Sequence, residues 1–202
     1  MIQIESAKAP FAIPRVAFQA ITVVGRADAM GLLPQDERIE TLDFPSFRKV
    51  FRYIQRAGIG RTLQFELEDD PSEMERALQN LNVALEESPS PDFEWTRMIE
   101  VLGFDLLSRL LGISASSVRR YSGSSRTTPD EDAGRLHFLS LAVGDLNGAY
   151  NEIGVRQWFD RSRAQLAGKS PSDLLKDRWR PEQPGPLQVR DLARALLASP
   201  AT

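Results

Sequence analysis

Residues 105–126, DLLSRLLGISASSVRRYSGSSR, decide the fold, because their pattern is that of two short helices joined by a tight turn. We expect a first helix over 105–111, a turn at Gly112-Ile113, and a second helix from its N-cap Ser114 to about 122. Gly112 can adopt the positive φ that such a turn requires. The apolar positions are spaced to share a small core; they are Leu107, Leu110, Leu111, Ile113, Val118 and Tyr121. The stretch therefore predicts a helix-turn-helix.

Polar residues at the start of the second helix, and one arginine just beyond it, indicate a contact with DNA. The candidates are Ser114, Ser116, Ser117, Arg119, Arg120 and Arg126. In a major groove, arginine pairs with guanine edges, whereas serine bonds to bases or phosphates. The same shape also occurs as an ordinary corner between helices in all-helical proteins, and the spacing alone leaves both interpretations open.

Composition limits the function classes. The 202 residues suffice for one large or two small domains, and the absence of cysteine excludes disulfides and thiolate metal sites. The single histidine, His137, is expected to be structural, and it makes a His-based metal site or a Ser-His triad improbable. No apolar run approaches the ~20 residues that span a bilayer. The net charge of −3 means that nucleic-acid binding needs a local basic patch.

The first 90 residues are harder to interpret. Prolines at positions 10 and 14 argue against a long helix over 11–24, which leaves a strand or an arm that packs on another subunit. Residues 46–57 have a helical apolar stripe with a basic opposite face, formed by Arg48, Lys49, Arg52 and Arg56. We interpret this face mainly as solvated surface, with a phosphate-contacting surface as the sharper alternative. Residues 62–67 alternate like a short strand.

Helix signals dominate the remainder. Asp70-Pro71-Ser72-Glu73 predicts a helix start with a capping box, and the SPSP of 88–91 predicts a linker and domain boundary. Further helices are expected from Asp92, after Thr128, near 155–159, from Ser170 and over 187–198. The predicted fold is mostly α, with an irregular N-terminal extension that contains a possible short strand. The predicted domains are 1–90, a helix-turn-helix domain over 91–145, and a C-terminal domain over 146–202.

A second motif follows the helix-turn-helix. Residues 158–175, WFDRSRAQLAGKSPSDLL, resemble the toxin-binding signature of the Xre/MbcA/ParS antitoxins, W-L-x-x-P-N-x-x-L-x-G-x-S-P-x-x-L-L. The matching residues are Trp158, Leu166, Gly168, Ser170, Pro171, Leu174 and Leu175, with Phe159 in place of a leucine. Members of that family also carry a helix-turn-helix just upstream, and the resemblance covers about half of the chain. Most matching residues are expected to be structural.

The resemblance implies an antitoxin that binds a RES-domain toxin acting on NAD, covers the active site of that toxin, and represses its own operon. The chain departs from the pattern at Ser162-Arg163, where the family has Pro-Asn, and at a longer connection over 178–186. It also ends soon after Leu197, without the tail of many members. The first 90 residues exceed the family plan, and an additional module for dimerisation or for covering the toxin is one interpretation.

Our leading hypothesis is therefore a cytoplasmic antitoxin that binds operator DNA as a homodimer and needs no metal or cofactor. The expected toxin contacts are Arg161, Arg163, Lys169, Arg190 and Arg194. The alternative is a stand-alone helix-turn-helix regulator without a toxin partner, and an adjacent toxin gene would separate the two. An enzyme is the weakest hypothesis, because no nucleophile, base and acid are combined in one pattern.

Overall fold

Proline sets the start of many helices in this chain. The computed structural model describes residues 2, 4–65 and 70–198. Proline stands in the first turn of α1 (Pro14–Ala29), α2 (Phe44–Arg56), α3 (Pro71–Glu86), α4 (Pro91–Leu102), α9 (Pro171–Leu174) and α10 (Pro184–Ala198). A backbone N–H in the first turn has no intrahelical acceptor, so proline loses no hydrogen bond there, and its fixed φ suits a helix. The mostly α prediction is confirmed.

The prediction of no long helix over 11–24 was wrong. Pro14 is the first residue of α1, which continues for 16 residues to Ala29. A proline interrupts a helix only from its interior, so Pro10 and Pro14 allow the helix to begin instead of preventing it. The buried face of α1 includes Val16, Ala20, Val23, Val24 and Ala27, whereas Phe18 and Ile21 are exposed.

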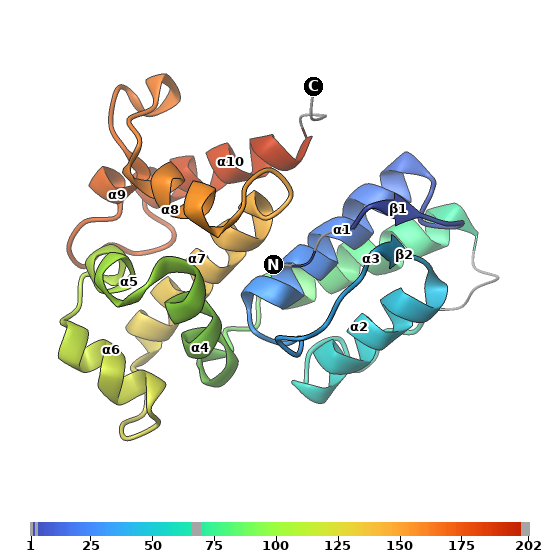
Figure 1. Ribbon diagram of the computed structural model, residues 1–202, viewed down its shortest axis with the longest axis horizontal. Coiled ribbons are helices and arrows are strands. Elements are labelled where there is room, and N and C mark those ends of the chain that lie inside the picture. The colour runs from blue at the N-terminus through green and yellow to red at the C-terminus, as the bar shows by residue number, and fades with distance from the viewer. Residues whose placement is uncertain (1, 3, 66–69, 199–202) are drawn as a thin grey trace.

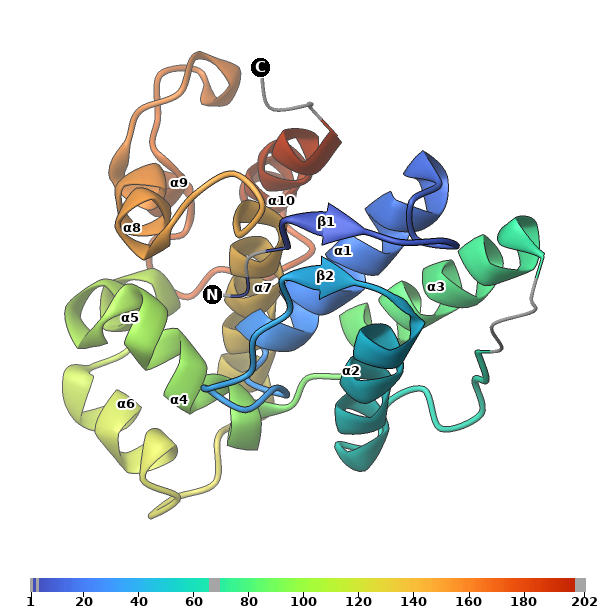
Figure 2. The ribbon, with the colours of Figure 1, turned by 45° about the vertical axis from the view of Figure 1, so that its right-hand side comes forward.

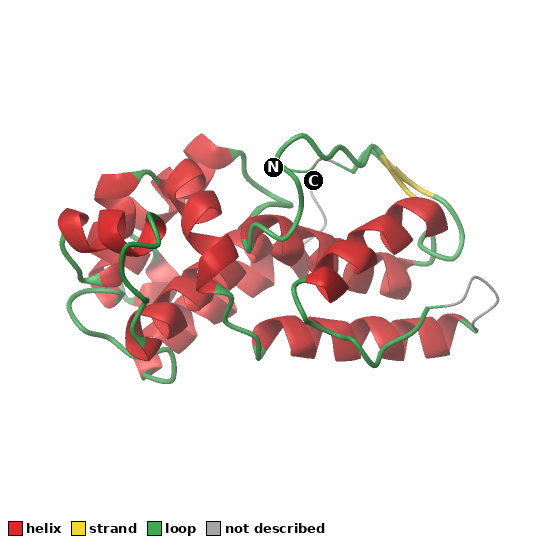
Figure 3. Cartoon of the chain, turned by 90° about the horizontal axis from the view of Figure 1, so that it is seen from below, coloured by secondary structure: helices red, strands yellow, loops and turns green. Residues whose placement is uncertain are grey.

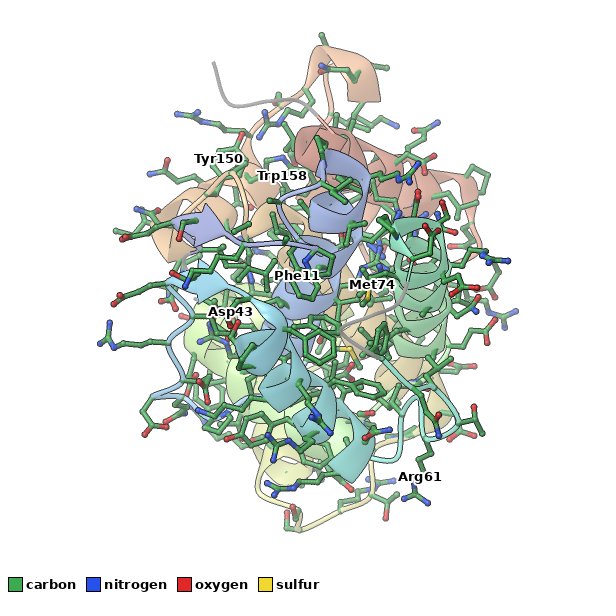
Figure 4. The ribbon with its side chains drawn as sticks, turned by 90° about the vertical axis from the view of Figure 1, so that its right-hand side faces the viewer. Phe11, Asp43, Arg61, Met74, Tyr150 and Trp158 are labelled. Atoms are coloured by element: carbon green, nitrogen blue, oxygen red, sulfur yellow. The ribbon has the colours of Figure 1, made fainter. Side chains whose placement is uncertain are left out.

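Helices α1, α2 and α3 form an N-terminal unit (Figure 1). A short parallel pair, β1 (Ser6–Ala7) and β2 (Thr41–Leu42), lies at its edge, and Figure 3 shows how small it is beside the helices. The core of the unit contains the side chains of Phe11, Phe47 and Met74, and the labels of Phe11 and Met74 in Figure 4 mark its centre. The strand expected over 62–67 is a loop at 62–65, and the rest lies outside the described residues.

The C-terminal unit contains α4, α5 (Phe104–Leu111), α6 (Ala115–Ser122), α7 (Asp130–Leu146), α8 (Glu152–Asp160), η1 (Ala164–Leu166), α9 and α10. These elements surround α7, whose residues from Asp132 to Leu146 are nearly all buried (Figure 2). One apolar cluster extends from Trp95 on α4 to Ala193 on α10. The residues of 91–145 and the described residues of 146–198 therefore share a core, whereas the N-terminal unit has its own.

Helices α1 and α7 join the two units. They approach most closely at two glycines: a Cβ on Gly25 would lie 3.0 Å from the Gly144 carbonyl oxygen, and one on Gly144 would lie 2.9 Å from Arg26 Cα. Ala29 of α1 belongs to the C-terminal core, and Leu141 of α7 belongs to the N-terminal core. Both cores thus depend on this crossing.

Several predicted helix starts differ from the structure in detail. Asp70 caps α3 by accepting the Ser72 N–H at 2.9 Å, without the expected capping box to Glu73. Helix α4 begins at Pro91 behind Ser90, so Asp92 lies in its first turn and does not cap it. Helix α7 begins at Asp130 with Pro129 in the N-cap position. A capping box that was not predicted starts α2, where the Asp43 carboxylate accepts the Ser46 N–H at 3.0 Å.

Candidate functional site

The helix-turn-helix forms as expected. Helix α5 ends at Leu111, Gly112 takes the left-handed conformation with φ of 66°, and α6 runs from Ala115 to Ser122. Ser114 caps α6, because its Oγ accepts the Ser117 N–H at 3.1 Å. Gly112 is required for a second reason, since a Cβ there would lie 2.0 Å from the Asp177 carbonyl oxygen. The segment between α9 and α10 thus closes over the turn.

Tryptophans on two other segments fix the position of the two helices. Trp95 on α4 lies 5.9 Å from Tyr121 on α6, measured between ring centroids, and its Nε1 donates to Thr128 Oγ1 at 2.9 Å. Trp179 Nε1 donates to the Leu110 carbonyl oxygen at the end of α5 at 2.7 Å. The Trp179 bond holds the end of α5, and the Trp95 ring and its bond to Thr128 hold α6 and the segment that follows it.

The candidate DNA contacts lie together along the outer side of α6 and just beyond it. Ser114, Ser116, Arg119, Arg120 and Arg126 are exposed, and Ser117 is half-buried. The three serine hydroxyls form a cluster around Ser114 Oγ, which lies 2.8 Å from Ser116 Oγ and 3.0 Å from Ser117 Oγ. Arg120 donates to Ser117 Oγ at 3.2 Å, and the Arg119 guanidinium lies 5.7 Å from the Phe104 ring centroid.

Acidic residues border this surface. A shallow cavity of about 470 Å³ beside the front of α6 is lined by Ser114 and Ser117 and by the carboxylates of Asp130, Glu131 and Asp132 at the start of α7. Arg135 forms an ion pair with Asp132. Arg135 and Arg178 line the same cavity, so positive and negative side chains are mixed beside the front of α6, whereas Arg119 and Arg120 are on its basic side.

The residues of the second motif build a tight turn and a capped helix. Trp158, Phe159, Leu166 and Leu175 are buried in the C-terminal core, and Gly168 has a φ of 80°. Ser170 and Asp173 form a reciprocal capping box at the start of α9. The Lys176 ammonium, with the bonds from Ser170, holds the pKa of Asp173 well below its usual range. These matching residues therefore have structural roles in this chain.

Three of the expected toxin contacts lie on the loop that carries η1. Arg161 and Lys169 are exposed on this loop, which projects from the C-terminal unit in Figure 1. The Arg163 guanidinium is half-buried, 5.5 Å from the Trp158 ring centroid. A cation stacked on an indole is held in place, so Arg163 stiffens the base of the loop.

The other two expected contacts, Arg190 and Arg194, lie on α10. The Arg194 side chain is 44% exposed and donates to Glu86 Oε1 at 2.8 Å. Arg190 is buried, and its guanidinium forms an ion pair with Asp145 of α7. Arg190 is therefore not presented to a partner in this structure, because its side chain faces Asp145 on α7.

A buried charge cluster was missed by the sequence analysis. The Asp145 carboxylate lies between Arg190 and Arg26, whose Nε is 3.3 Å from Asp145 Oδ1, and Arg26 also reaches Glu86 at 2.7 Å. Burial lowers the pKa of the Arg190 guanidinium to about 10, although the negative charge of Asp145 opposes that shift. The only signal in the sequence is a carboxylate within the otherwise apolar second half of α7.

His137 is a structural residue, as expected for a lone histidine. Its Nδ1 lies 2.6 Å from Glu94 Oε1 and its Nε2 lies 3.0 Å from the Glu86 carbonyl oxygen. A carbonyl oxygen only accepts, so Nε2 carries a hydrogen and one further proton is held between Nδ1 and the Glu94 carboxyl. Within the described residues, no group of three or more His, Asp or Glu side chains is placed to hold a metal ion.

Comparisons with known proteins give no relative, so a function for this chain has to be inferred from its own residues. No family model, no curated protein and no solved structure matches this chain. In the part of the chain that the structure describes, no helix combines the length and the apolar character needed to cross a membrane.

Proposed function

We propose that this chain is an antitoxin that represses its own operon through α6 and neutralises a RES-domain toxin through its C-terminal unit. The observation that carries the proposal is the joining of two motifs in one core. The helix-turn-helix packs against the segment that follows the antitoxin-like motif, through the contacts of Gly112 with Asp177 and of Trp179 with Leu110. Each motif alone is weakly specific, whereas this order and packing suit an antitoxin of the Xre/MbcA/ParS type.

On DNA, α6 would enter the major groove. Ser114, Ser116 and Ser117 at its front suit hydrogen bonds to bases or phosphates, and Arg119 and Arg120 suit guanine edges or phosphates. Arg126, beyond the helix, suits a phosphate. Because helix-turn-helix proteins usually read two half-sites, the binding form proposed is a homodimer. A repressor of this kind acts in the cytoplasm.

On the toxin, the proposed contact surface is the loop from Arg161 to Lys169, together with Arg194. Exposed arginine and lysine side chains would meet carboxylates of the toxin and hold the antitoxin over the NAD-binding pocket. Arg190 is left out of this surface, because its charge is already balanced by Asp145. The loop is basic and projects from the body, two features that suit insertion into an acidic recess.

The DNA half of the proposal is tested by Arg119→Ala with Arg120→Ala. Salt dependence of operator binding counts the phosphates neutralised, with a slope of about −0.9 for each contact. We expect the double variant to lower that slope by up to about two units and to lose preference for the operator over random DNA. Fluorescence anisotropy over a salt series measures both quantities.

A matched control removes two arginines far from α6. Arg15→Ala with Arg76→Ala changes the charge equally, on exposed side chains at the start of α1 and on α3 that pair with Glu75 and Glu73. This control should bind the operator as the wild type does. Equal slopes and equal preference in the wild type and the Arg119/Arg120 variant would remove α6 from the DNA interface.

The toxin half is tested by co-expression of the tagged chain with the product of the neighbouring gene. A stable complex that suppresses NAD consumption by that product supports the antitoxin. Arg161→Glu with Lys169→Glu should weaken the complex and restore NAD consumption, whereas operator binding should persist. Retained promoter binding without capture of any neighbouring product would instead identify a stand-alone transcriptional regulator.

A further inference from the structure

A row of arginines on α2 has no role in the proposed contacts described so far. Arg48, Arg52 and Arg56 are spaced at i, i+4 and i+8, so they lie one above another along the helix, and Arg61 follows in the next loop. We call these four residues the α2 row. All four side chains are exposed, and the three on α2 lie on the side opposite the buried Phe47, Val50 and Ile54.

The α2 row is not balanced by its own helix. Helix α2 contains no acidic residue, and like charges at i, i+4 spacing destabilise a helix. Within the described residues, Arg48 and Arg52 form no ion pair, whereas the neighbouring Lys49 is bound to Glu37 at 2.7 Å. Arg56 lies 5.6 Å from the Tyr53 ring centroid, which leaves its N–H groups free to meet an acceptor.

The helix that carries the row is fixed in position. The capping box of Asp43 and Ser46 holds its first turn, and Phe47 packs against Phe11 with ring centroids 5.1 Å apart. Its last turn is followed by Gly58 and Gly60, which reverse the chain with positive φ. Arg48, Arg52 and Arg56 therefore project from a helix that is packed into the N-terminal core.

Helices α2 and α6 lie along the same edge of the molecule. In Figure 1 both α2 and α6 lie along the lower edge, to the right and to the left. Figure 4 is turned about the vertical axis, so its lower edge is the same side, and there Arg61 and the loop that follows α6 both reach the bottom. A DNA duplex lying along this edge would pass both helices.

We propose that the α2 row binds the phosphate backbone of the same DNA duplex whose major groove receives α6. This inference rests on the proposed function, since it needs DNA at α6. Guanidinium groups one helical turn apart present a row of donors to successive phosphates, and such contacts add affinity without sequence information. Acidic and basic side chains are mixed beside the front of α6, whereas the row adds positive charge alone and would lengthen the footprint.

The test is Arg48→Ala with Arg52→Ala, compared with the Arg119/Arg120 and Arg15/Arg76 double variants. We expect the salt slope to fall by about two units and affinity to fall about tenfold, equally on operator and random DNA. Preference for the operator should be unchanged, unlike in the Arg119/Arg120 variant. Arg48→Lys with Arg52→Lys should restore the slope, since each phosphate is still neutralised.

Hydroxyl-radical footprinting supplies a second readout. The wild type should protect backbone positions on one flank of the α6 site, and the Arg48/Arg52 variant should lose only that flank. A wild-type protein that binds no operator would refute the proposed function itself. Normal operator binding with an unchanged slope and footprint in the Arg48/Arg52 variant would refute the α2 row alone.

Discussion

At the scale of single residues, the clearest consequence follows from the proton that Glu94 and His137 share. The Glu94 side chain is fully buried on α4, and it touches a histidine that is held on its other side by the Glu86 carbonyl oxygen. Burial raises the pKa of Glu94, although the bond to His137 opposes this shift. A carboxyl group whose pKa is raised in the folded protein stabilises the fold at pH values below its ordinary pKa. That stabilisation is lost as the pH rises through the raised pKa of the folded state.

We therefore expect Glu94→Gln to gain stability relative to the wild type as the pH rises above about 4.3, the ordinary value for glutamate. The amide keeps a polar group beside His137 without a charge to bury. Glu94→Ala should cost about 1–3 kcal/mol, because it leaves Nδ1 without a partner. Urea denaturation between pH 4 and pH 8 measures both variants, and a Glu94→Gln difference that does not vary with pH would contradict this account.

Residue-level reasoning from the sequence worked where the chemistry was local. A single histidine was expected to be structural, and Ser114 was expected to cap α6; the structure has both. The role of Arg190 could not be derived in this way, because its partner Asp145 is 45 residues distant in the chain. An exposed arginine and a buried arginine cannot be distinguished in the sequence when the burial depends on contacts between distant helices.

Among the elements, α6 depends strongly on its cap because it is only eight residues long. Short helices are marginal in isolation, so the N-cap and the packing of Tyr121 on Trp95 must hold α6 in place.

We expect Ser114→Ala to destabilise the protein by about 1 kcal/mol and Ser114→Gly by only a few tenths. Ser116→Ala is the matched control, since its hydroxyl bonds to Ser114 Oγ and to no backbone N–H. Thermal unfolding compares the three variants. Equal losses for Ser114→Ala and Ser116→Ala would mean that the serine cluster, and not the cap, stabilises α6.

Local residue patterns predicted some elements of this chain and missed others. Turn and cap residues predicted α5, the turn and α6 to within about a residue, since glycine and serine there act on their immediate neighbours. The same rules misplaced α1, because a proline signals a helix start as readily as a break. They also missed β1 and β2 as a pair, because two-residue strands 35 positions apart leave no periodic pattern.

For the whole molecule, the decisive feature is the seam between the two cores. Asp145 binds Arg190 of the C-terminal unit and Arg26 of the N-terminal unit, and Glu86 accepts from Arg26 and Arg194. The sequence suggested a boundary near 88–91, and the two cores do change there, but nothing in the local pattern indicated how the units are joined.

Asp145→Ala should cost about 3–5 kcal/mol, because it leaves two arginines buried without their shared carboxylate. Glu73→Ala is the control: its ion pair with Arg76 is exposed on both sides and contributes about 0–1 kcal/mol. Trp95, Trp158 and Trp179 all lie in the C-terminal core, so tryptophan fluorescence follows that unit while circular dichroism follows both. We expect the fluorescence and circular-dichroism transitions of Asp145→Ala to coincide and to shift together relative to the wild type. A loss of stability as small as that of Glu73→Ala would contradict the role given to Asp145.

The glycine crossing also constrains how such a gene can change over generations. Loss of the segment that encodes α1 to α3 would bare Leu141 and Gly144 and strip Arg26 and Glu86 from the opposing charges on α7 and α10. A lineage that sheds this segment must at the same time replace several residues of α7 and α10. We therefore expect that exchange of the N-terminal unit alone, without changes in α7 and α10, would destabilise the rest of the chain.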